Sequence, residues 1–176
     1  ANDPAYAEKI AEMRTVLSEW QREVGDLGLM PESEIEIREE KAGSRYQILR
    51  EKPDLLPKLV QAATDASDSE VPLTQFVEKL GDEDAAIRYW AATGLANRTT
   101  DDPAILAKLK SALEDSAPVV RIASAFALCR SGDPESGIPV LAKELSGDQQ
   151  WARLQAAIAL DEVEEMAKPA LAELQA

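Results

Sequence analysis

Three stretches of the chain repeat one pattern and decide its fold. They read LGDEDAAIRYWAATGL at residues 80–95, LEDSAPVVRIASAFAL at residues 113–128 and LSGDQQWARLQAAIAL at residues 145–160. An arginine, an alanine and a leucine recur at equivalent places, with offsets of 33 and 32 residues: Arg88, Arg121 and Arg153; Ala92, Ala125 and Ala157; Leu95, Leu128 and Leu160. A pattern that returns at this interval is typical of architectures in which each unit stacks on its neighbour.

Each copy has the periodicity of a helix and is followed by a second, shorter helical segment. The second segments read PAILAKLKSAL, GIPVLAKEL and KPALAELQA, and short polar breaks separate the segments. Residues 53–80 form a degenerate first copy, and no strand-like alternation occurs in this region. The sequence therefore predicts an all-α fold, an α-solenoid of about four antiparallel helix pairs over residues 53–176. Ile87, Ala91 and Leu95 are expected to form the buried face of one first helix.

The front of the chain lies outside the repeat. Asp3 followed by Pro4 marks a helix start. Apolar residues then recur at spacings of three and four: Tyr6, Ile10, Met13, Leu17 and Trp20. This predicts one amphipathic helix over residues 1–25. Residues 26–52 show no clear period, so we expect an irregular, extended and charged connector that lies against another surface.

The charge of the chain narrows the classes of partner. The formal net charge is -14 and the isoelectric point is near 4.4. Such a surface repels nucleic-acid phosphates and anionic membranes, and the basic residues are scattered rather than clustered. No run of residues has the length and apolar character of a membrane helix. We therefore expect neither nucleic acid nor a membrane as the partner.

The composition also argues against an active site in this chain. It contains no histidine, which excludes a Ser-His-Asp triad, a Cys-His dyad and any zinc site that uses imidazole. Its one cysteine, Cys129, reads as a small buried hydrophobe. The acidic clusters lack calcium-loop spacing and suit helix starts. We expect no catalytic residue, no cofactor and no metal ligand in this chain.

The repeated arginine has two interpretations. Asp82 lies six residues before Arg88, Asp115 lies six before Arg121, and Asp148 lies five before Arg153. Such pairs favour a structural ladder, in which each arginine donates to a carboxylate or to the carbonyls of the turn before its helix. The alternative is a row of cations that binds an anionic ligand.

Four aromatic residues are candidates for an interaction surface: Trp20, Tyr89, Trp90 and Trp151. Exposed rings of this kind suit a carbohydrate or a protein partner. Trp90 lies three residues after Ile87, a spacing that favours packing between helices. Trp151 lies earlier in its helix, where partial exposure is expected.

Two resemblances add to these patterns. The D…[IV]R…A…L pattern of residues 80–176 resembles short HEAT-like repeats, which implies stacked helix pairs and a binding or scaffolding role. The front stretch NDPAYAEKIAEMRTVLSEWQREVGDLGLMPESEI, residues 2–35, resembles the segment that closes the catalytic domain of bacterial sulfatases of the alkaline-phosphatase-like superfamily. Some of those sulfatases continue into a helical repeat tail, and the two segments here follow the same order.

The sulfatase resemblance does not bring catalytic residues into this chain. That family makes a formylglycine from Cys or Ser in C/S-x-P/A-x-R and binds calcium through Asp and Asn. The residues that begin at Cys129 do not match this motif, and Ser116-Ala117-Pro118 has its arginine one place too late, at Arg121. The resemblance therefore implies that the catalytic domain and its calcium lie before Ala1, and that the parent is periplasmic or extracellular.

These patterns lead to one expectation and one alternative. We expect a non-catalytic helical-repeat scaffold, the C-terminal part of a sulfatase, whose first helix and connector dock on the catalytic domain. This chain alone would then not be an enzyme, and oligomerisation through it stays possible. The alternative is a free-standing HEAT-like adaptor that binds a basic protein partner, in which the stripe from Tyr6 to Trp20 must pack on the repeat.

Overall fold

The computed structural model describes residues 3–170, and every regular element within this range is a helix. The first part contains the 3-10 helix η1 (Pro4–Tyr6) and the α-helices α1 (Ala7–Val24), α2 (Glu32–Ala42) and α3 (Arg45–Ile48). The second part contains α4 (Leu55–Ser67), α5 (Leu73–Lys79), α6 (Ala85–Arg98), α7 (Pro103–Ala112), α8 (Pro118–Arg130), α9 (Pro134–Leu145), α10 (Gln150–Glu162) and the 3-10 helix η2 (Glu164–Ala170). The predicted all-α fold is confirmed.

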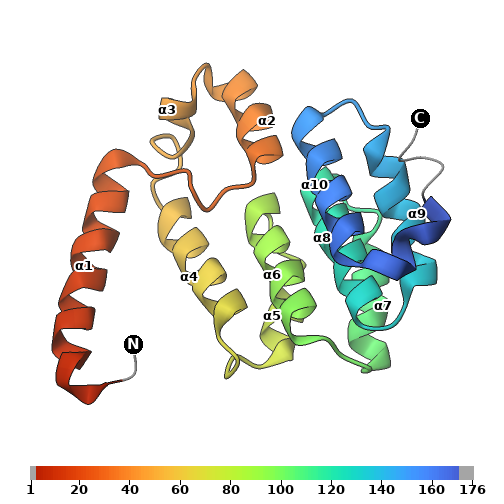
Figure 1. Ribbon diagram of the computed structural model, residues 1–176. Helices are drawn as coiled ribbons and strands as arrows, with labels where there is room; N and C mark the ends of the chain where they lie inside the picture. Colours follow the sequence, from red (N-terminus) through yellow and green to blue (C-terminus); the bar gives the residue numbers. More distant parts are fainter. Residues whose placement is uncertain (1–2, 171–176) are drawn as a thin grey trace.

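From α4 onward the helices form stacked pairs (Figure 1). The first helices of the pairs, α4, α6, α8 and α10, pack against one another in chain order. Each second helix packs on the first helix of the following pair: α5 on α6, α7 on α8 and α9 on α10, and α9 also packs on α8. The 3-10 helix η2 packs on α9 and α10 and occupies the place of the last second helix. The described chain is therefore an α-solenoid, as the repeat spacing predicts.

Aspartates fix where several of these helices begin. The Oδ1 atom of Asp84 accepts a hydrogen bond of 2.9 Å from the amide of Ala86, and Asp102 caps α7 in the same way at 2.8 Å. Asp102 and Asp133 are each followed by a proline at the first helical position. This combination satisfies a free amide and presets the backbone, so each turn ends at a defined residue.

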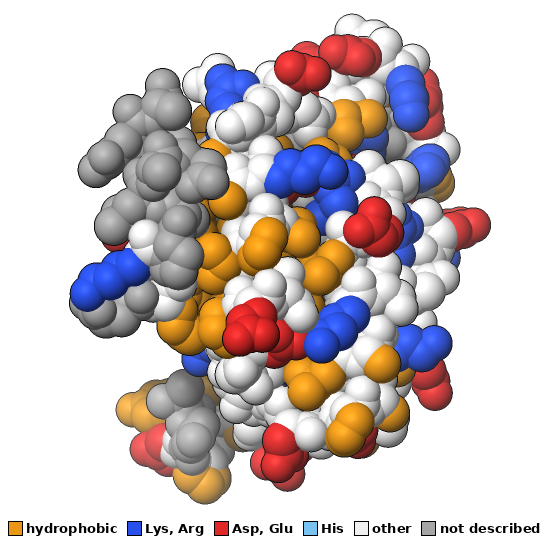
Figure 2. Space-filling view, turned by 90° about the vertical axis from the view of Figure 1, so that its right-hand side faces the viewer, with side chains coloured by type: hydrophobic (Ala, Val, Ile, Leu, Met, Phe, Trp, Pro, Cys, Tyr) orange, Lys and Arg blue, Asp and Glu red, His pale blue; other side chains and the backbone are white. Residues whose placement is uncertain are grey.

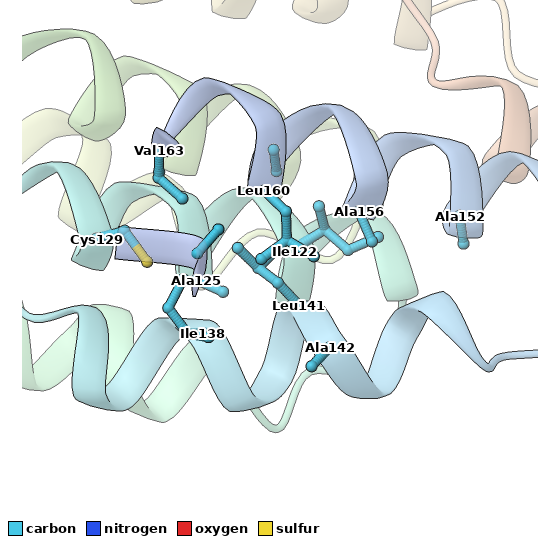
Figure 3. Packing of buried hydrophobic residues seen from close by; sticks show 12 residues of the cluster. Ile122, Ala125, Cys129, Ile138, Leu141, Ala142, Ala152, Ala156, Leu160 and Val163 are labelled. Carbon is cyan, nitrogen blue, oxygen red and sulfur yellow. The ribbon is translucent and has the colours of Figure 1, made fainter. Parts of the chain in front are cut away.

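The core is continuous between neighbouring pairs. Ile87, Ala91 and Leu95 are only 3%, 1% and 0% exposed, as expected for the buried face of α6. In the next pairs, side chains from α8, α9 and α10 meet in one cluster, and Figure 3 shows Leu141 of α9 pointing toward Ile122 of α8, beside Ala156 and Leu160 of α10. Large side chains thus fill the space that alanines leave between the helices, which gives close packing across each repeat boundary.

Residues 26–52 are not the irregular, extended connector that the sequence predicts. They contain α2 and α3, and their apolar side chains join a core cluster with α4 and α6: Met30, Ile35, Ile48 and Leu49. Only one side of this segment is buried, so a few apolar residues are enough to pack it. A helical period is therefore hard to detect in its sequence. The segment therefore packs on the repeat itself, and the expectation that it lies against an outside surface does not hold for these residues.

The first helix is present but uncovered. It ends at Gly25, which adopts a left-handed φ of 66°, as expected for a glycine that stops a helix. None of the residues of α1 is buried. The side chains of its apolar stripe include some of the most exposed of the described hydrophobic residues: Tyr6 62%, Met13 64%, Leu17 53% and Trp20 54%. In Figure 1 the helix stands beside α4 at the outer edge of the molecule.

Candidate functional site

The repeated arginines hold the turns that precede their own helices. The Nη1 atom of Arg88 donates to the carbonyls of Asp82 and Glu83, at 2.9 and 3.1 Å. Arg121 makes the same contacts with the carbonyls of Asp115 and Ser116, at 2.7 and 3.2 Å. Arg153 donates to the carbonyls of Gly147 and Asp148, at 2.9 and 3.0 Å. Each arginine therefore closes one inter-helix turn through backbone oxygens.

The carboxylate partners come later in the chain than the arginines: the partner of Arg88 lies at the start of the next repeat, and the partner of Arg121 lies in the second helix of its own pair. The Nε and Nη2 atoms of Arg88 donate to both oxygens of Asp115, at 2.7 and 2.8 Å. The Nε atom of Arg121 donates to Glu144 at the end of α9, at 2.7 Å. Of the two acceptors that the sequence allows within each repeat, the arginines use the turn carbonyls, among them those of Asp82, Asp115 and Asp148. The short spacing in the chain places the Nη1 atom of each arginine at the backbone of the turn before its helix. The Nε atoms of Arg88 and Arg121 then face carboxylates later in the chain.

The first arginine of the ladder lies before the repeats, in α2, where the sequence pattern does not indicate it. Arg38 of α2 donates to both carboxylate oxygens of Asp84, at 2.9 Å each, and also to Glu34 at 3.1 and 2.9 Å. Arg38 and Glu34 are four residues apart on a helix, which is a visible signal, but the contact with Asp84 spans 46 residues. Glu144 was likewise missed because it lies in a second helix, outside the repeated pattern.

The charges in this ladder stabilise one another. Burial alone would raise the pKa of the Asp115 carboxyl, but the hydrogen bonds and positive charge of Arg88 outweigh burial and lower that pKa. The same bonds from Asp115 raise the pKa of Arg88. Asp84 follows the same rule: burial raises its pKa, and the guanidinium of Arg38 together with the amide of Ala86 and the charge of Lys52 lowers that pKa overall. These carboxylates are therefore kept ionised by structural partners.

Arg153 differs from the other arginines of the ladder. Its Nη1 atom closes the turn, but within residues 3–170 its Nε and Nη2 atoms have no carboxylate partner. Asp148, the predicted partner of Arg153, binds it through the backbone carbonyl and not through the carboxylate. Arg153 therefore has the turn contacts of Arg88 and Arg121, but among the described side chains it lacks their contact with a carboxylate later in the chain.

The four aromatic candidates do not form one surface. Trp90 packs at the edge of the cluster between α2, α4 and α6, and its Nε1 atom donates to the carbonyl of Leu29 at 2.7 Å. Tyr89 lies edge-on to Trp90, with ring centroids 5.3 Å apart. Trp20 is on the uncovered α1, and Trp151 is half-buried on α10. Trp90 therefore has the packing role that its spacing favours.

A shallow groove of about 260 Å³ crosses the first helices of the last three pairs. Its floor is Ala123 and Phe126 of α8. Tyr89 of α6 and Ile158 of α10 stand on opposite sides, and Glu162 adds a carboxylate. The groove is mostly apolar, so it suits an apolar side chain of a protein partner more than a polar substrate.

The cysteine and the acidic cluster have structural roles in the described chain. Burial raises the pKa of the Cys129 thiol to about 11, with the charge of Asp133 adding to the shift. The first acidic cluster binds its own backbone, since Asp82 accepts from the amide of Asp84 at 2.8 Å. Residues 3–170 contain no group of three potential metal ligands. None of the described helices is long and apolar enough to cross a membrane.

Comparisons with known proteins agree with the geometry of the stacked pairs. The family model of HEAT repeats matches residues 71–161, which is more than half of the chain. A comparison with curated proteins finds no match. The match covers α6 to α10 and the pattern that carries the arginine ladder. The chain belongs to the HEAT repeat family.

Proposed function

We propose that this HEAT-repeat chain is the non-catalytic C-terminal part of a sulfatase, a hydrolase of sulfuric esters, and serves as its scaffold. The repeats make the chain a helical-repeat scaffold or interaction region. The sulfatase parent rests on the resemblance of residues 2–35 and on the order in which that segment and the repeats follow one another. In this proposal the formylglycine and calcium belong to a catalytic domain outside this chain, and the parent is periplasmic or extracellular.

The observation that carries the proposal is the uncovered apolar face of α1. In proteins, packing of an amphipathic face supplies most of the stability of a helix. The stripe of α1 finds no such packing in the described chain, since Met13 and Trp20 are 64% and 54% exposed. An exposed apolar face of this kind marks a contact with another protein surface. The catalytic domain of the same polypeptide is the cover that we propose.

The scaffold has a built connection to this face. Gln21 near the end of α1 donates to Asp26 at 3.1 Å, and Asp26 also accepts from the amide of Gly28 at 2.9 Å. The carbonyl of Leu29 then binds Trp90 in the repeat. A domain docked on α1 would therefore be joined to the stack through a short segment that is anchored on both sides.

The proposal is tested by reading the source DNA upstream of the codon for Ala1. We expect an open frame of a few hundred codons that contains C/S-x-P/A-x-R. A start codon or a secretion signal directly before Ala1 would contradict the proposal. Purified chain should also release no sulfate from an aryl sulfate, and turnover that persists in independently purified batches would overturn its non-catalytic role.

The alternative function is a free-standing adaptor for a basic protein partner. The groove on the first helices and the net charge of -14 favour this function. An adaptor of this kind requires α1 to pack on the repeat, whereas the stripe of α1 is exposed. Substitution of Phe126 by Ala, with the core otherwise intact, would weaken binding of a basic partner in the adaptor but leave a sulfatase parent unaffected in its chemistry.

A further inference from the structure

The outer face of α10 is apolar and uncovered at the end of the stack. Leu154 and Ile158 are 48% and 51% exposed, and Trp151 precedes them on the same face. Figure 2, which looks onto the side of the molecule that carries α9 and α10, shows hydrophobic side chains gathered between charged ones. Residues spaced by three and four along a helix form one stripe, so these side chains present a single surface.

The equivalent face of α8 shows what such a surface binds. With the repeat offset of 32 residues, Trp151, Leu154 and Ile158 correspond to Val119, Ile122 and Phe126. Ile122 is 1% exposed and lies in one core cluster with Ala152 and Ala156 of α10, and the partly buried Phe126 packs against the same cluster. Val119 is 0% exposed and lies in a separate cluster on the side of α6. The stripe positions of Ile122 and Phe126 therefore form a repeat–repeat interface in α8, and the same positions form an open surface in α10.

Small residues on the covering helix make this interface possible. Ile122 shares a core cluster with Ala152, Ala156 and Ala159 of α10 (Figure 3). The corresponding pairs three residues apart are Ser124 and Ala127 in α8, and Ala91 and Gly94 in α6. Small side chains let the next helix approach closely, and the large side chains of the preceding helix fill the gap. The open face of α10 therefore matches a helix that carries a further pair of small residues.

Arg153 provides a second, independent observation at the same end. In the repeats before it, Arg88 donates to Asp115 at the start of the next repeat, and Arg121 donates to Glu144 in α9 of its own pair, at 2.7 Å in both cases. Arg153 has the same turn contacts, and no carboxylate within residues 3–170 is paired with it. A further repeat would supply Arg153 with the contact that Asp115 makes with Arg88.

We propose that the face formed by Trp151, Leu154 and Ile158 is an open repeat interface that binds one more helix pair of this series, carried by the same polypeptide. Continuity with the α6–α8 and α8–α10 interfaces defines its chemistry. The first helix of that pair runs parallel to α10, presents two small residues three positions apart, and has a carboxylate shortly before its first turn. That carboxylate binds the Nε and Nη2 edge of Arg153.

A second copy of the chain does not offer this chemistry. The small-residue faces of α6, α8 and α10 are already buried against the preceding helices, with Ala91 1%, Ala127 0% and Ala156 0% exposed. The first helix of the series, α4, exposes polar side chains instead, among them Lys58 and Gln61. A continuing repeat therefore fits the α10 face better than a symmetric contact between copies.

The first test reads the source DNA downstream of the codon for Ala176. We expect a frame that continues with a further copy of the D…[IV]R…A…L pattern, its arginine about 32 or 33 residues beyond Arg153, the interval at which stacked units recur here. A stop codon before such a copy would overturn the proposal. This result is independent of the upstream frame, so the sulfatase proposal and the open interface fail or hold separately.

The second test extends the chain and measures protection of α10. A duplicate of residues 113–145 is joined after Ala176, and amide hydrogen exchange of α10 is compared with that of the unextended chain. We expect at least tenfold slower exchange in α10, because a stacked neighbour stabilises the terminal repeat. Equal exchange rates in the extended and unextended chains would overturn the proposal.

Two matched variants separate specific stacking from a mere tether. In the first, the residues of the duplicate that correspond to Ser124 and Ala127 are replaced by glutamate, which removes the small pair and should abolish the added protection. In the second, the residue of the duplicate that corresponds to Asp115 is replaced by asparagine, which removes the carboxylate offered to Arg153 and should reduce the protection while the turn contacts of Arg153 stay intact. Protection that survives both substitutions would contradict a repeat interface.

Discussion

The contact between Arg88 and Asp115 is the sharpest place to test the arginine ladder. The two side chains are only 13% and 12% exposed and share two hydrogen bonds, at 2.7 and 2.8 Å. We consider Arg88→Met, which keeps the aliphatic stem, Asp115→Asn, which keeps the size, and the double variant. The free energy of unfolding of all four proteins would be measured by urea denaturation.

The expected magnitudes follow from the partners that each variant leaves behind. A hydrogen bond to a charged group contributes about 1.5–3 kcal/mol, and removal of one member of a buried pair costs about 3–5 kcal/mol. Asp115→Asn should cost about 2 kcal/mol, because Arg88 keeps its bonds to the turn carbonyls and Asn keeps an acceptor. Arg88→Met should cost about 3 kcal/mol, because it also frees those carbonyls. The coupling energy of the pair should be about 1.5 kcal/mol or more.

An exposed ion pair in the same molecule is the control. Arg45 and Glu39 lie 2.9 Å apart, but their side chains are 49% and 41% exposed. Solvent-exposed pairs contribute about 0–1 kcal/mol, so Arg45→Met should cost less than about 0.5 kcal/mol. If the coupling energy of Arg88 and Asp115 were as small as that expected for the exposed pair, the arginine ladder would not stabilise the fold.

The pH dependence gives the same test a second readout. The folded-state pKa of Asp115 is lowered below the unfolded value of about 3.9, so its contribution is fully present above that value. The contribution is lost as the pH falls through the lower folded-state pKa. The stability difference between the parent chain and Asp115→Asn should therefore be constant near pH 7 and shrink below about pH 4.

Three further predictions concern the core of the stack. Leu128→Ala should lower the free energy of unfolding by about 2–5 kcal/mol in a denaturant titration, because Leu128 is 0% exposed; a loss below about 1 kcal/mol would show that the site collapses without cost. Gly137→Ala should destabilise by about 1–2 kcal/mol despite better helix propensity, because the added Cβ would lie 2.4 Å from the backbone oxygen of Ala125; a higher melting temperature would contradict the close α8–α9 contact. Cys129, with its pKa raised to about 11, should resist a thiol reagent at pH 8 in the folded chain and react in urea; equal labelling rates in both states would show that it is not buried.

The solenoid was predictable because its core positions repeat. Each first helix uses the same buried leucine, seen at Leu95, Leu128 and Leu160, which are 0%, 0% and 1% exposed. Because the same buried position recurs in each pair, the same residue recurs in the sequence, and comparison of the sequence with itself detects it. The second helices vary more in sequence, yet their apolar residues still mark them.

The parts that sequence reasoning missed depend on contacts between distant residues. The helix α2 is held by Met30 and Ile35 in a core cluster and by the Arg38–Asp84 pair, 46 residues apart in the chain. The contacts of Arg88 with Asp115 and of Arg121 with Glu144 were not predicted for the same reason. A spacing of six residues is visible in the sequence, whereas the 27 residues between Arg88 and Asp115 carry no local signal.

The direction of the ladder bears on how the parts of this molecule work together. Arg38 reaches Asp84, Arg88 reaches Asp115 and Arg121 reaches Glu144, so each guanidinium binds an element that comes later in the chain. Because α2 supplies the first of these arginines, residues 26–52 belong mechanically to the stack rather than to a connector. The helix α1 has no ladder contact and no buried residue. The natural division of the described chain therefore falls near Gly25, between a scaffold held together by forward contacts and a helix whose apolar face remains available to a second domain.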